Sequence, residues 1–136
     1  MTLEKVPFAK LLGIQLDSQE PGHAVMSMEI RPEHKQNHGV VHGGGVAALI
    51  DSAMALAIMP MLAENERTTT VDLTIHYLRP LTEGTVRASA RVIRAGRRVI
   101  TVSAELFDHK ERLAATALSS YLRISSADNT NYPDKN

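Results

Sequence analysis

The first third of the chain contains short segments whose apolar positions follow two different periods. Residues 8–12 have the spacing of a short amphipathic helix, which we expect to end at Gly13. In residues 22–30 every second position from Ala24 to Ile30 is apolar, and this alternation predicts a half-buried strand. Residues 31–39 are polar and contain proline and glycine, so they predict a loop.

A long apolar segment, residues 46–63, follows three consecutive glycines. Only Asp51, Ser52 and Pro60 interrupt it, so by length it is barely sufficient to span a membrane. Its alanines are weak membrane anchors, and no basic cluster flanks it. We therefore expect a helix that is buried on most sides within a folded domain, with Pro60 kinking or ending its last turn.

After this helix the apolar period changes to two, which predicts four strands. The residues expected to share a face are Val71, Leu73, Ile75 and Tyr77 in the first strand, Val86, Ala88, Ala90 and Val92 in the second, and Ile100, Val102, Ala104 and Leu106 in the third; the fourth strand is residues 113–124. Turns are expected at 94–98, where Gly96 is free to take a positive φ, and at 107–112.

Short connections favour antiparallel neighbours, so these strands predict one antiparallel sheet that curls around the long helix. The expected fold is a two-layer α+β domain, in which small side chains such as Ala88, Ala90 and Ala104 let the sheet approach the helix closely. We place a single domain at residues 1–125. The polar residues 126–136 have nothing to bury, and we expect them to be a disordered tail.

Composition narrows the classes of function. Fifteen Lys and Arg residues balance fifteen Asp and Glu residues among 136, so there is no overall field to attract nucleic acid or an anionic membrane. The absence of cysteine excludes disulfides, thiolate metal sites and cysteine nucleophiles. Residues 1–16 mix Glu and Lys with apolar residues and lack the continuous apolar core of a signal peptide, so we expect a cytoplasmic protein.

Asp51 is the one charged residue in the long apolar segment. A buried ionised carboxylate without partners is costly, so Asp51 either points to water or has groups arranged around it. The glycines just before the helix suggest what those groups serve, because the first N–H groups of a helix have no internal partner and carry the positive end of its dipole. If Gly43 lies on the loop leading into the helix, its N–H is open to the oxyanion of a carbonyl under attack.

The spacing between these two residues raises a geometric difficulty. Asp51 follows Gly43 by eight residues, which is about 12 Å along a helix axis. The two residues can act on one carbonyl only if the substrate spans that gap, or if Asp51 belongs to a partner subunit.

His42-Gly43-Gly44 followed by Asp51, with Asn37 upstream, resembles the motif of hotdog-fold thioesterases of the phenylacetate-degradation (PaaI) type. The segments "PFAKLLGIQL", "PGHAVMSMEI", "VDLTIHYLRPL" and "AGRRVITVSAELFD" are similar to that family in the same order, so the resemblance covers roughly residues 8–124. It implies a hotdog fold whose subunits dimerise edge to edge, with dimers that often pair into tetramers. It also implies a site at the dimer interface, where the acid of one helix meets the His-Gly-Gly loop of the partner.

The resemblance assigns a role to each residue of the motif. Gly43 supplies the oxyanion N–H, and Asp51 is either the nucleophile or the base that activates water. Asn37 and His42 orient the thioester or the loop, and Thr70 lies near the attacking water. The implied substrate is an acyl-CoA, and no cofactor is required.

Two clusters of residues remain. Arg91, Arg94, Arg97 and Arg98 lie at one predicted hairpin, which is either a solvated turn or a seat for the phosphates of coenzyme A. The resemblance favours Arg97 and Arg98 for the second role. His38 and His42 have the spacing of a metal pair on a helix, but Gly39 and Gly43 argue against a helix there and no third ligand is near in sequence, so we expect no metal site.

Three functions compete. The first is an acyl-CoA thioesterase that acts as a homodimer or a dimer of dimers (a homotetramer) and binds neither nucleic acid nor membrane. The second is a non-catalytic acyl-CoA-binding module, against which the presence of Asp51 argues. The third is a hydratase or dehydratase of the same fold, whose usual sequence surroundings are not visible here. The acyl group stays open, since helix residues such as Met54 and strands of a partner would line its pocket.

Overall fold

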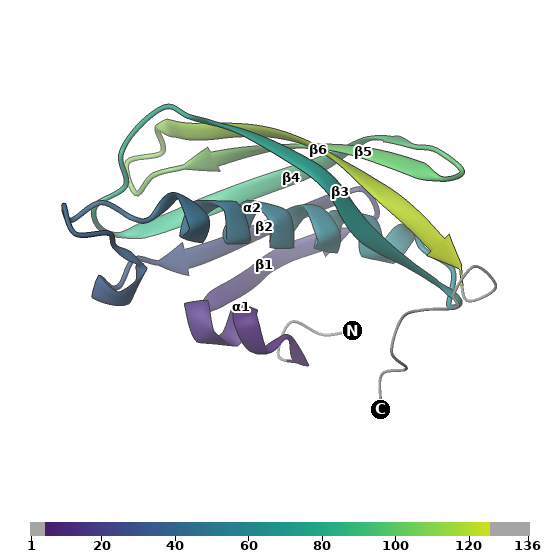
Figure 1. Ribbon diagram of the computed structural model, residues 1–136, viewed down its shortest axis with the longest axis horizontal. Helices are drawn as coiled ribbons and strands as arrows, with labels where there is room; N and C mark the ends of the chain where they lie inside the picture. Colours follow the sequence, from purple (N-terminus) through teal and green to yellow (C-terminus); the bar gives the residue numbers. More distant parts are fainter. Residues whose placement is uncertain (1–4, 126–136) are drawn as a thin grey trace.

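The protein is a curved sheet wrapped around one long helix, as seen in a computed structural model that describes residues 5–125 (Figure 1). Its elements are α1 (Pro7–Leu12), β1 (Ile14–Glu20), β2 (His23–Glu29), η2 (Pro32–His34), α2 (Gly43–Ile58), η3 (Met59–Met61), β3 (Glu66–Tyr77), β4 (Thr85–Ala95), β5 (Val99–Phe107) and β6 (Leu113–Ser125). The six strands are antiparallel neighbours in the order β1-β2-β4-β5-β6-β3, so β1 and β3 are the edges. The predicted two-layer α+β arrangement is confirmed, and the predicted tail lies outside the described residues.

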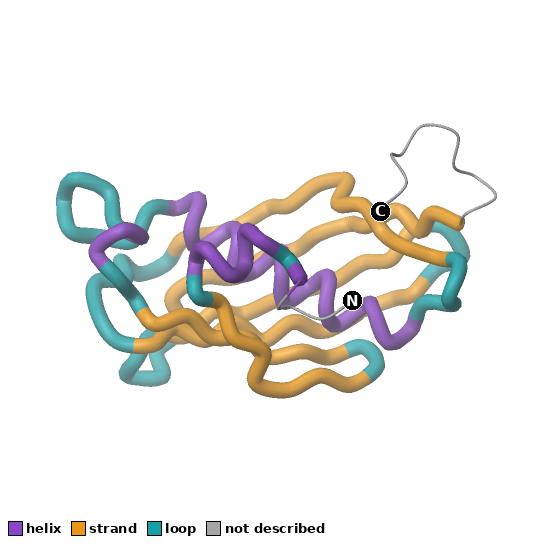
Figure 2. Tube along the Cα trace, turned by 90° about the horizontal axis from the view of Figure 1, so that it is seen from below, coloured by secondary structure: helices purple, strands orange, loops and turns teal. Residues whose placement is uncertain are grey.

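The short helix α1 forms as its sequence predicts. Pro7 occupies its first turn, where a missing N–H costs nothing, and Gly13 ends it in the left-handed conformation with φ 74°. The N–H of Gly13 donates to the carbonyl groups of the last turn. Figure 2 shows α1 and α2 on the same side of the sheet, and α1 packs against both β1 and α2.

The long helix α2 starts earlier than expected. His42 is its N-cap and Gly43 its first residue, so the three glycines form the first turn of the helix and do not lie on a loop before it. Its end is as predicted, because α2 stops at Ile58 and the chain tightens into the 3₁₀ turn η3, which contains Pro60. By length and mean hydropathy the segment Gly43–Met61 would suffice to cross a membrane, but in this fold it packs against β2, β4 and β5.

The core lies between α2 and the concave face of the sheet. The helix buries Val46, Leu49, Ile50, Ala53, Met54, Leu56, Ala57 and Ile58. Opposite it, Ala88 and Ala90 of β4 and Ala104 of β5 are buried, as predicted for close approach of sheet and helix. These small side chains leave room for methionine and leucine side chains from α2 and β2.

The predicted apolar face of β3 is wrong at two positions. Leu73 and Ile75 pack against the core, but Val71 is 62% exposed and Tyr77 is 55% exposed. The pairing of β3 with β6 shifts between Thr70 and Asp72, so Val71 is a bulge residue without a partner in the ladder. Tyr77 keeps the inward register, but it lies at the end of the strand beyond the cover of the core.

The strand β1 was not predicted. It buries only Ile14, its other residues are exposed, and apolar and polar positions alternate only over residues 14–17. Its position is set by backbone pairing with β2 at the edge of the sheet. A strand held mainly by ladder hydrogen bonds leaves almost no mark on the hydrophobic pattern.

The two turns of the β4–β5–β6 meander lie where the sequence predicts them. The predicted positive φ of Gly96 is wrong. Glycine is needed there because a Cβ would lie 2.5 Å from the carbonyl oxygen of Val99.

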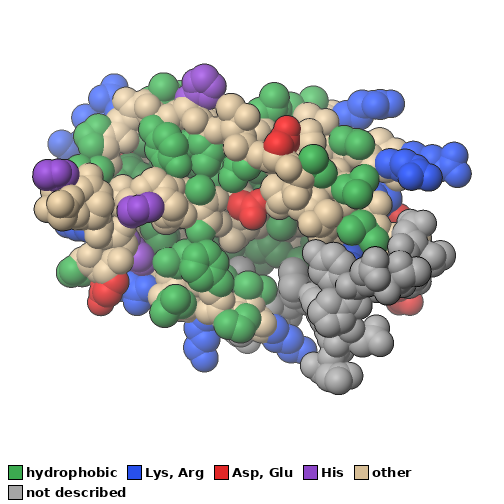
Figure 3. Space-filling model, in the orientation of Figure 1, with side chains coloured by type: hydrophobic (Ala, Val, Ile, Leu, Met, Phe, Trp, Pro, Cys, Tyr) green, Lys and Arg blue, Asp and Glu red, His purple; other side chains and the backbone are tan. Residues whose placement is uncertain are grey.

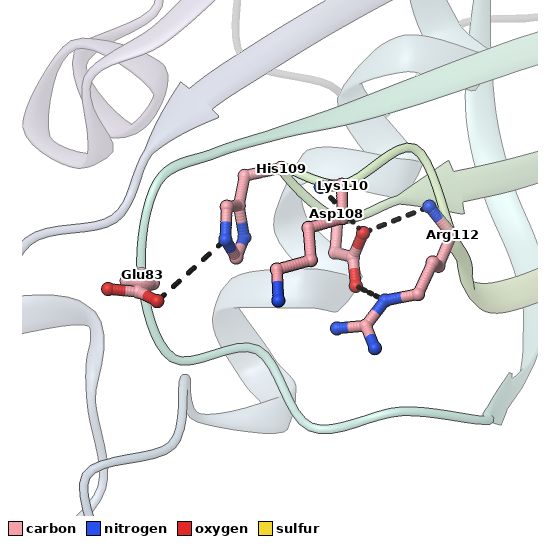
Figure 4. Close-up of polar contacts among 5 residues, drawn as sticks. All are labelled: Glu83, Asp108, His109, Lys110 and Arg112. Carbon is pink, nitrogen blue, oxygen red and sulfur yellow. Dashed lines mark hydrogen bonds and ion pairs between the residues drawn. The ribbon is translucent and has the colours of Figure 1, made fainter.

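In the second turn the buried carboxylate of Asp108 accepts the N–H groups of Lys110 and Arg112, both at 2.9 Å, and Nε–H of Arg112 at 2.8 Å (Figure 4). Burial alone would raise the pKa of Asp108, but the hydrogen bonds from Arg112 and Lys110 outweigh it and hold that pKa below its usual value.

Candidate active site

The carboxylate of Asp51 has partners from two strands. Asp51 is half-buried on α2, and its Oδ1 accepts the hydroxyl of Thr70 on β3 at 3.0 Å. The same oxygen accepts the hydroxyl of Tyr121 on β6 at 2.6 Å, and that hydroxyl lies 3.1 Å from the backbone carbonyl oxygen of Asp51. The charge in the apolar helix is therefore held by two donors, one of them the hydroxyl of Thr70, whose role near an attacking water stays a prediction.

Tyr121 is a member of this cluster that the sequence did not indicate. Its side chain is only 2% exposed. Burial raises the pKa of Tyr121, and the nearby charge of Asp51 raises it further, so the hydroxyl stays protonated and remains a donor. Two features of the sequence could have indicated it. The alternation along β6 places Tyr121 on the inward face, and a buried tyrosine hydroxyl needs a hydrogen-bond partner.

The start of α2 forms a second cluster, around His42. Nδ1 of His42 accepts the N–H of Gly44 at 2.8 Å, so in the neutral ring the proton lies on Nε2. The carbonyl of His42 accepts the N–H groups of Gly45 at 2.9 Å and Val46 at 3.4 Å. Of the first four N–H groups of the helix, only that of Gly43 has no acceptor among residues 5–125.

Side-chain contacts explain why glycine occupies this first turn. A Cβ on Gly44 would lie 2.9 Å from Nδ1 of His42, which would disturb the cap. A Cβ on Gly43 would lie 3.2 Å from the hydroxyl of Tyr77, which donates to the carbonyl of Gly43 at 2.9 Å. Tyr77, at the end of β3, therefore holds the backbone of the residue whose N–H is open.

An apolar pocket of about 590 Å³ adjoins this open N–H. Its lining residues are Val40, Val41, Gly43, Gly44, Val46, Tyr77, Leu78, Arg79, Pro80, Leu81 and Ala114. The volume lies in the range of pockets that hold small organic ligands, roughly 300–1,000 Å³. Met54, which the sequence suggested as a pocket residue, is instead fully buried in the core.

Asn37 does not join either cluster. It is exposed at the tip of the loop that the bridge between Lys35 and Val41 closes. Among residues 5–125 it is not one of those that line the pocket beside Gly43. Its orienting role stays a prediction.

Within one chain the glycine cluster and Asp51 are apart. Both belong to α2, so their separation along the axis is the expected distance of about 12 Å. Tyr77 holds Gly43 and Thr70 holds Asp51, so the two clusters lie at opposite ends of the outer part of β3. A single chain therefore presents two separate clusters along the edge strand β3.

Arg97 and Arg98 lie at the far end of the molecule from Gly43. The turn that carries them is bonded to the end of β6, where the N–H of Arg123 donates to the carbonyl of Arg98 at 2.7 Å. Tyr77, which contacts Gly43, pairs with Ala115 near the start of β6. Along β6, Ala115 and Arg123 are about 25 Å apart. In Figure 1 the β4–β5 turn and the start of α2 are at opposite ends, and Figure 3 shows positive side chains projecting at the end of that turn.

Comparison with known proteins bears on the family and the fold of this chain. The family model of the thioesterase superfamily matches residues 38–115. The medium/long-chain acyl-CoA thioesterase YigI of Escherichia coli K12 is 27% identical over 137 residues, which cover 90% of this chain and 88% of YigI.

Two solved structures are similar in fold and in sequence. The PaaI protein of the E. coli phenylacetic acid degradation operon superimposes with a TM-score of 0.82 at 28% identity, covering 90% of this chain and 87% of that one. The phenylacetic acid degradation protein PaaI of Thermus thermophilus, determined as a point mutant, gives a TM-score of 0.80 at 33% identity, covering 87% and 99%. These matches confirm the PaaI-type resemblance and the hotdog fold. The chain belongs to the thioesterase superfamily and is a thioester hydrolase.

Proposed function

We propose that this thioesterase hydrolyses acyl-CoA esters to a carboxylic acid and free coenzyme A, at a site completed by two copies of the chain. The observation that carries the proposal is the N–H of Gly43, the one unpaired donor in the first turn of α2 within residues 5–125, beside an apolar pocket. A donor of this kind stabilises the oxyanion that forms when a thioester carbonyl is attacked. A binding-only module has no use for the carboxylate of Asp51, so its presence favours hydrolysis.

The chemistry needs only groups of the protein and water. With Asp51 as base, its carboxylate takes a proton from water while the water oxygen bonds to the acyl carbon. The carbonyl electrons move to the oxygen held by Gly43, then return to expel sulfur, and the thiolate takes the proton from Asp51. With Asp51 as nucleophile, a carboxylate oxygen bonds to the acyl carbon, the thiolate leaves, and water then cleaves the anhydride. His42, as N-cap, fixes the start of α2, and its exposed neutral ring carries the proton on Nε2.

The open edge of β3 supports a site made from two chains. Within residues 5–125 β3 pairs with β6 alone, so the outer side of its segment 70–77 has no ladder partner there. In our arrangement two β3 strands pair antiparallel with Thr74 on the two-fold axis. Leu73 then lies opposite Ile75 of the second copy. Val71 bulges out between Thr70 and Asp72, so it takes no position in this pairing.

The same register brings the two clusters together. It sets Thr70 opposite Tyr77 of the second copy, and both side chains are on the inward face because their partners on β6, Tyr121 and Ala115, are inward. Since Thr70 holds Asp51 and Tyr77 holds Gly43, the acid of one chain then meets the open N–H of the other. This arrangement removes the separation found within one chain.

The acyl and nucleotide parts of the substrate follow from the surroundings. The pocket beside Gly43 is lined mostly by aliphatic residues and has one cation, Arg79, which suits an apolar acyl chain. The name of YigI, a medium/long-chain acyl-CoA thioesterase, points in the same direction. Arg97 and Arg98 are our candidates for the coenzyme A phosphates.

A mixing experiment tests both the activity and the shared site. Asp51→Asn and Gly43→Pro variants are each expected to lose hydrolysis of octanoyl-CoA, followed as release of free thiol. After the two variants are unfolded together and refolded, random pairing makes half the dimers mixed, and each mixed dimer has one intact site. About a quarter of the parent activity should therefore return. No recovery from mixed dimers, isolated by two affinity tags, would exclude a site shared in this way.

A further inference from the structure

The hydroxyl of Tyr121 connects the core of the sheet to the reacting carboxylate. Tyr121 comes from β6, is 2% exposed, and lies 70 residues from Asp51 in sequence. Its hydroxyl reaches Oδ1 of Asp51 at 2.6 Å, shorter than the 3.0 Å between Thr70 and the same oxygen. The two donors come from adjacent strands, since Thr70 and Tyr121 face each other in the ladder of β3 and β6.

These two bonds make the oxygens of Asp51 unequal. Oδ1 accepts two hydroxyls, which occupies both of its in-plane lone pairs. No donor from residues 5–125 reaches Oδ2. The carboxylate is therefore held by one oxygen, and the other is left free on the half-exposed face of α2.

We propose that Tyr121 is a positioning residue that fixes the carboxylate of Asp51, so that Oδ2 alone meets the attacking water or the thioester. The inference rests on the proposed function, in which Asp51 reacts. A rigid phenol ring packed in the core holds its hydroxyl in place, whereas Thr70 is on the exposed edge strand and can turn about one bond. The raised pKa of Tyr121 agrees with this role, because the hydroxyl keeps its proton and remains a donor.

Tyr121→Phe tests the proposal, because it keeps the ring in the core and removes only the hydroxyl. We expect kcat for octanoyl-CoA to fall by about 10-fold or more with KM changed less than about two-fold, since misplacement of a reacting group affects the chemical step and not uniform binding. Ser27→Ala is the matched control: the Ser27 hydroxyl is also nearly buried and donates to a carboxylate, that of Asp17 at 3.1 Å, but on β1 and β2. This control should keep the parent kcat.

The outcomes separate this proposal from the function on which it rests. If Asp51→Asn turns over substrate at the parent rate, the role of Asp51 itself is wrong. If Asp51→Asn is inactive while folded Tyr121→Phe keeps the parent kcat, or changes KM alone, Tyr121 is a core residue and the positioning role is overturned.

A second pair of variants covers the case in which Tyr121→Phe does not fold. Thr70 lies on the exposed strand, so Thr70→Val and Thr70→Ser should both fold. The two hydroxyl bonds to Oδ1 predict that Thr70→Val lowers kcat several-fold and that Thr70→Ser, which keeps a donor, recovers part of that loss. Equal kcat values for parent, Thr70→Val and Thr70→Ser would show that the hydroxyl bonds to Oδ1 do not position the carboxylate.

Discussion

Replacing Gly43 with proline removes the proposed oxyanion donor and leaves most of its surroundings in place. Proline lacks an N–H, and the first position of a helix is where it is tolerated best. The preceding residue, His42, has φ −59° and ψ 136°, the extended conformation that a residue before proline requires. The carbonyl of residue 43 still accepts the hydroxyl of Tyr77. We therefore expect Gly43→Pro to fold and assemble like the parent.

The expected loss is large, because no neighbouring donor replaces the one removed. The N–H groups of Gly44, Gly45 and Val46 are already bonded to His42. Removal of a single oxyanion donor lowers kcat by about 100- to 1,000-fold in enzymes of acyl transfer, which is about 3–4 kcal/mol of transition-state stabilisation. KM should change little, because the bond strengthens mainly as charge develops on the oxygen.

Gly43→Ala is the matched control for this experiment. It keeps the N–H and adds the same Cβ, which would lie 3.2 Å from the hydroxyl of Tyr77, so it reports the steric part alone. Steady-state kinetics on octanoyl-CoA, with free thiol as the readout, give kcat for both variants, and circular dichroism with size-exclusion chromatography verifies fold and assembly. A folded Gly43→Pro whose kcat lies within a few-fold of that of Gly43→Ala would refute the oxyanion role of Gly43.

Three further predictions concern the interface, the coenzyme A phosphates and the pH dependence of stability. Thr74→Cys should form a dimer that survives denaturing gels without reductant, because Thr74 lies on the proposed two-fold axis of a chain that has no other cysteine. His76→Cys, on the same strand about 13 Å from its own copy, should not form this dimer. Arg97→Ala combined with Arg98→Ala should raise KM for acyl-CoA several-fold at low salt with kcat little changed, and should not affect a truncated thioester without the nucleotide; an unchanged KM would make these arginines a solvated turn. Above roughly pH 10, unfolded tyrosine loses a proton that Tyr121, with its raised pKa, retains in the folded state, so this group lowers the free energy of unfolding by about 1.4 kcal/mol per pH unit. Urea titrations should therefore show a shallower alkaline decline for Tyr121→Phe than for the parent, and equal slopes would contradict the shift.

A fourth prediction concerns acid stability and the turn between β5 and β6. The lowered pKa of Asp108 means that its stabilising effect is present above the pKa of the unfolded carboxyl and is lost as the pH falls through the folded one. Asp108→Asn should therefore lower Tm near neutral pH, and its Tm should converge with that of the parent on acidification. Thermal melts from about pH 2 to pH 7 measure this, and a constant Tm difference across that range would show that the carboxylate charge does not matter.

Sequence patterns predicted the elements that bury an apolar face and missed those held in other ways. The change of period from helical to alternating marked α2 and the four strands after it, because each has a face in the core. β1 was missed because pairing with β2, and not burial, holds it. The bulge at Val71 was missed because one extra residue in a strand leaves composition and spacing almost unchanged.

The candidate active site was predictable only where its residues are close together in the sequence. The spacing from His42 to Asp51 is a motif on one helix, so a resemblance could carry it. Tyr121 is brought to Asp51 by the register of β6 against β3, which depends on every turn and bulge between them. The sequence taken residue by residue does not give that register, and this is why it did not indicate Tyr121.

The bulge at Val71 connects these observations. Without it, Thr70 and Tyr77, seven positions apart on β3, would point to opposite faces of the sheet, because side chains alternate along a strand. The unpaired residue restores the same face to both, so that Thr70 reaches Asp51 and Tyr77 reaches Gly43 on the helix side. It also makes the outer segment of β3 symmetric about Thr74, which is the condition for two identical edges to pair with their clusters matched. One inserted residue thus places Thr70 and Tyr77 on the same face and gives the strand edge the symmetry that the proposed dimer requires.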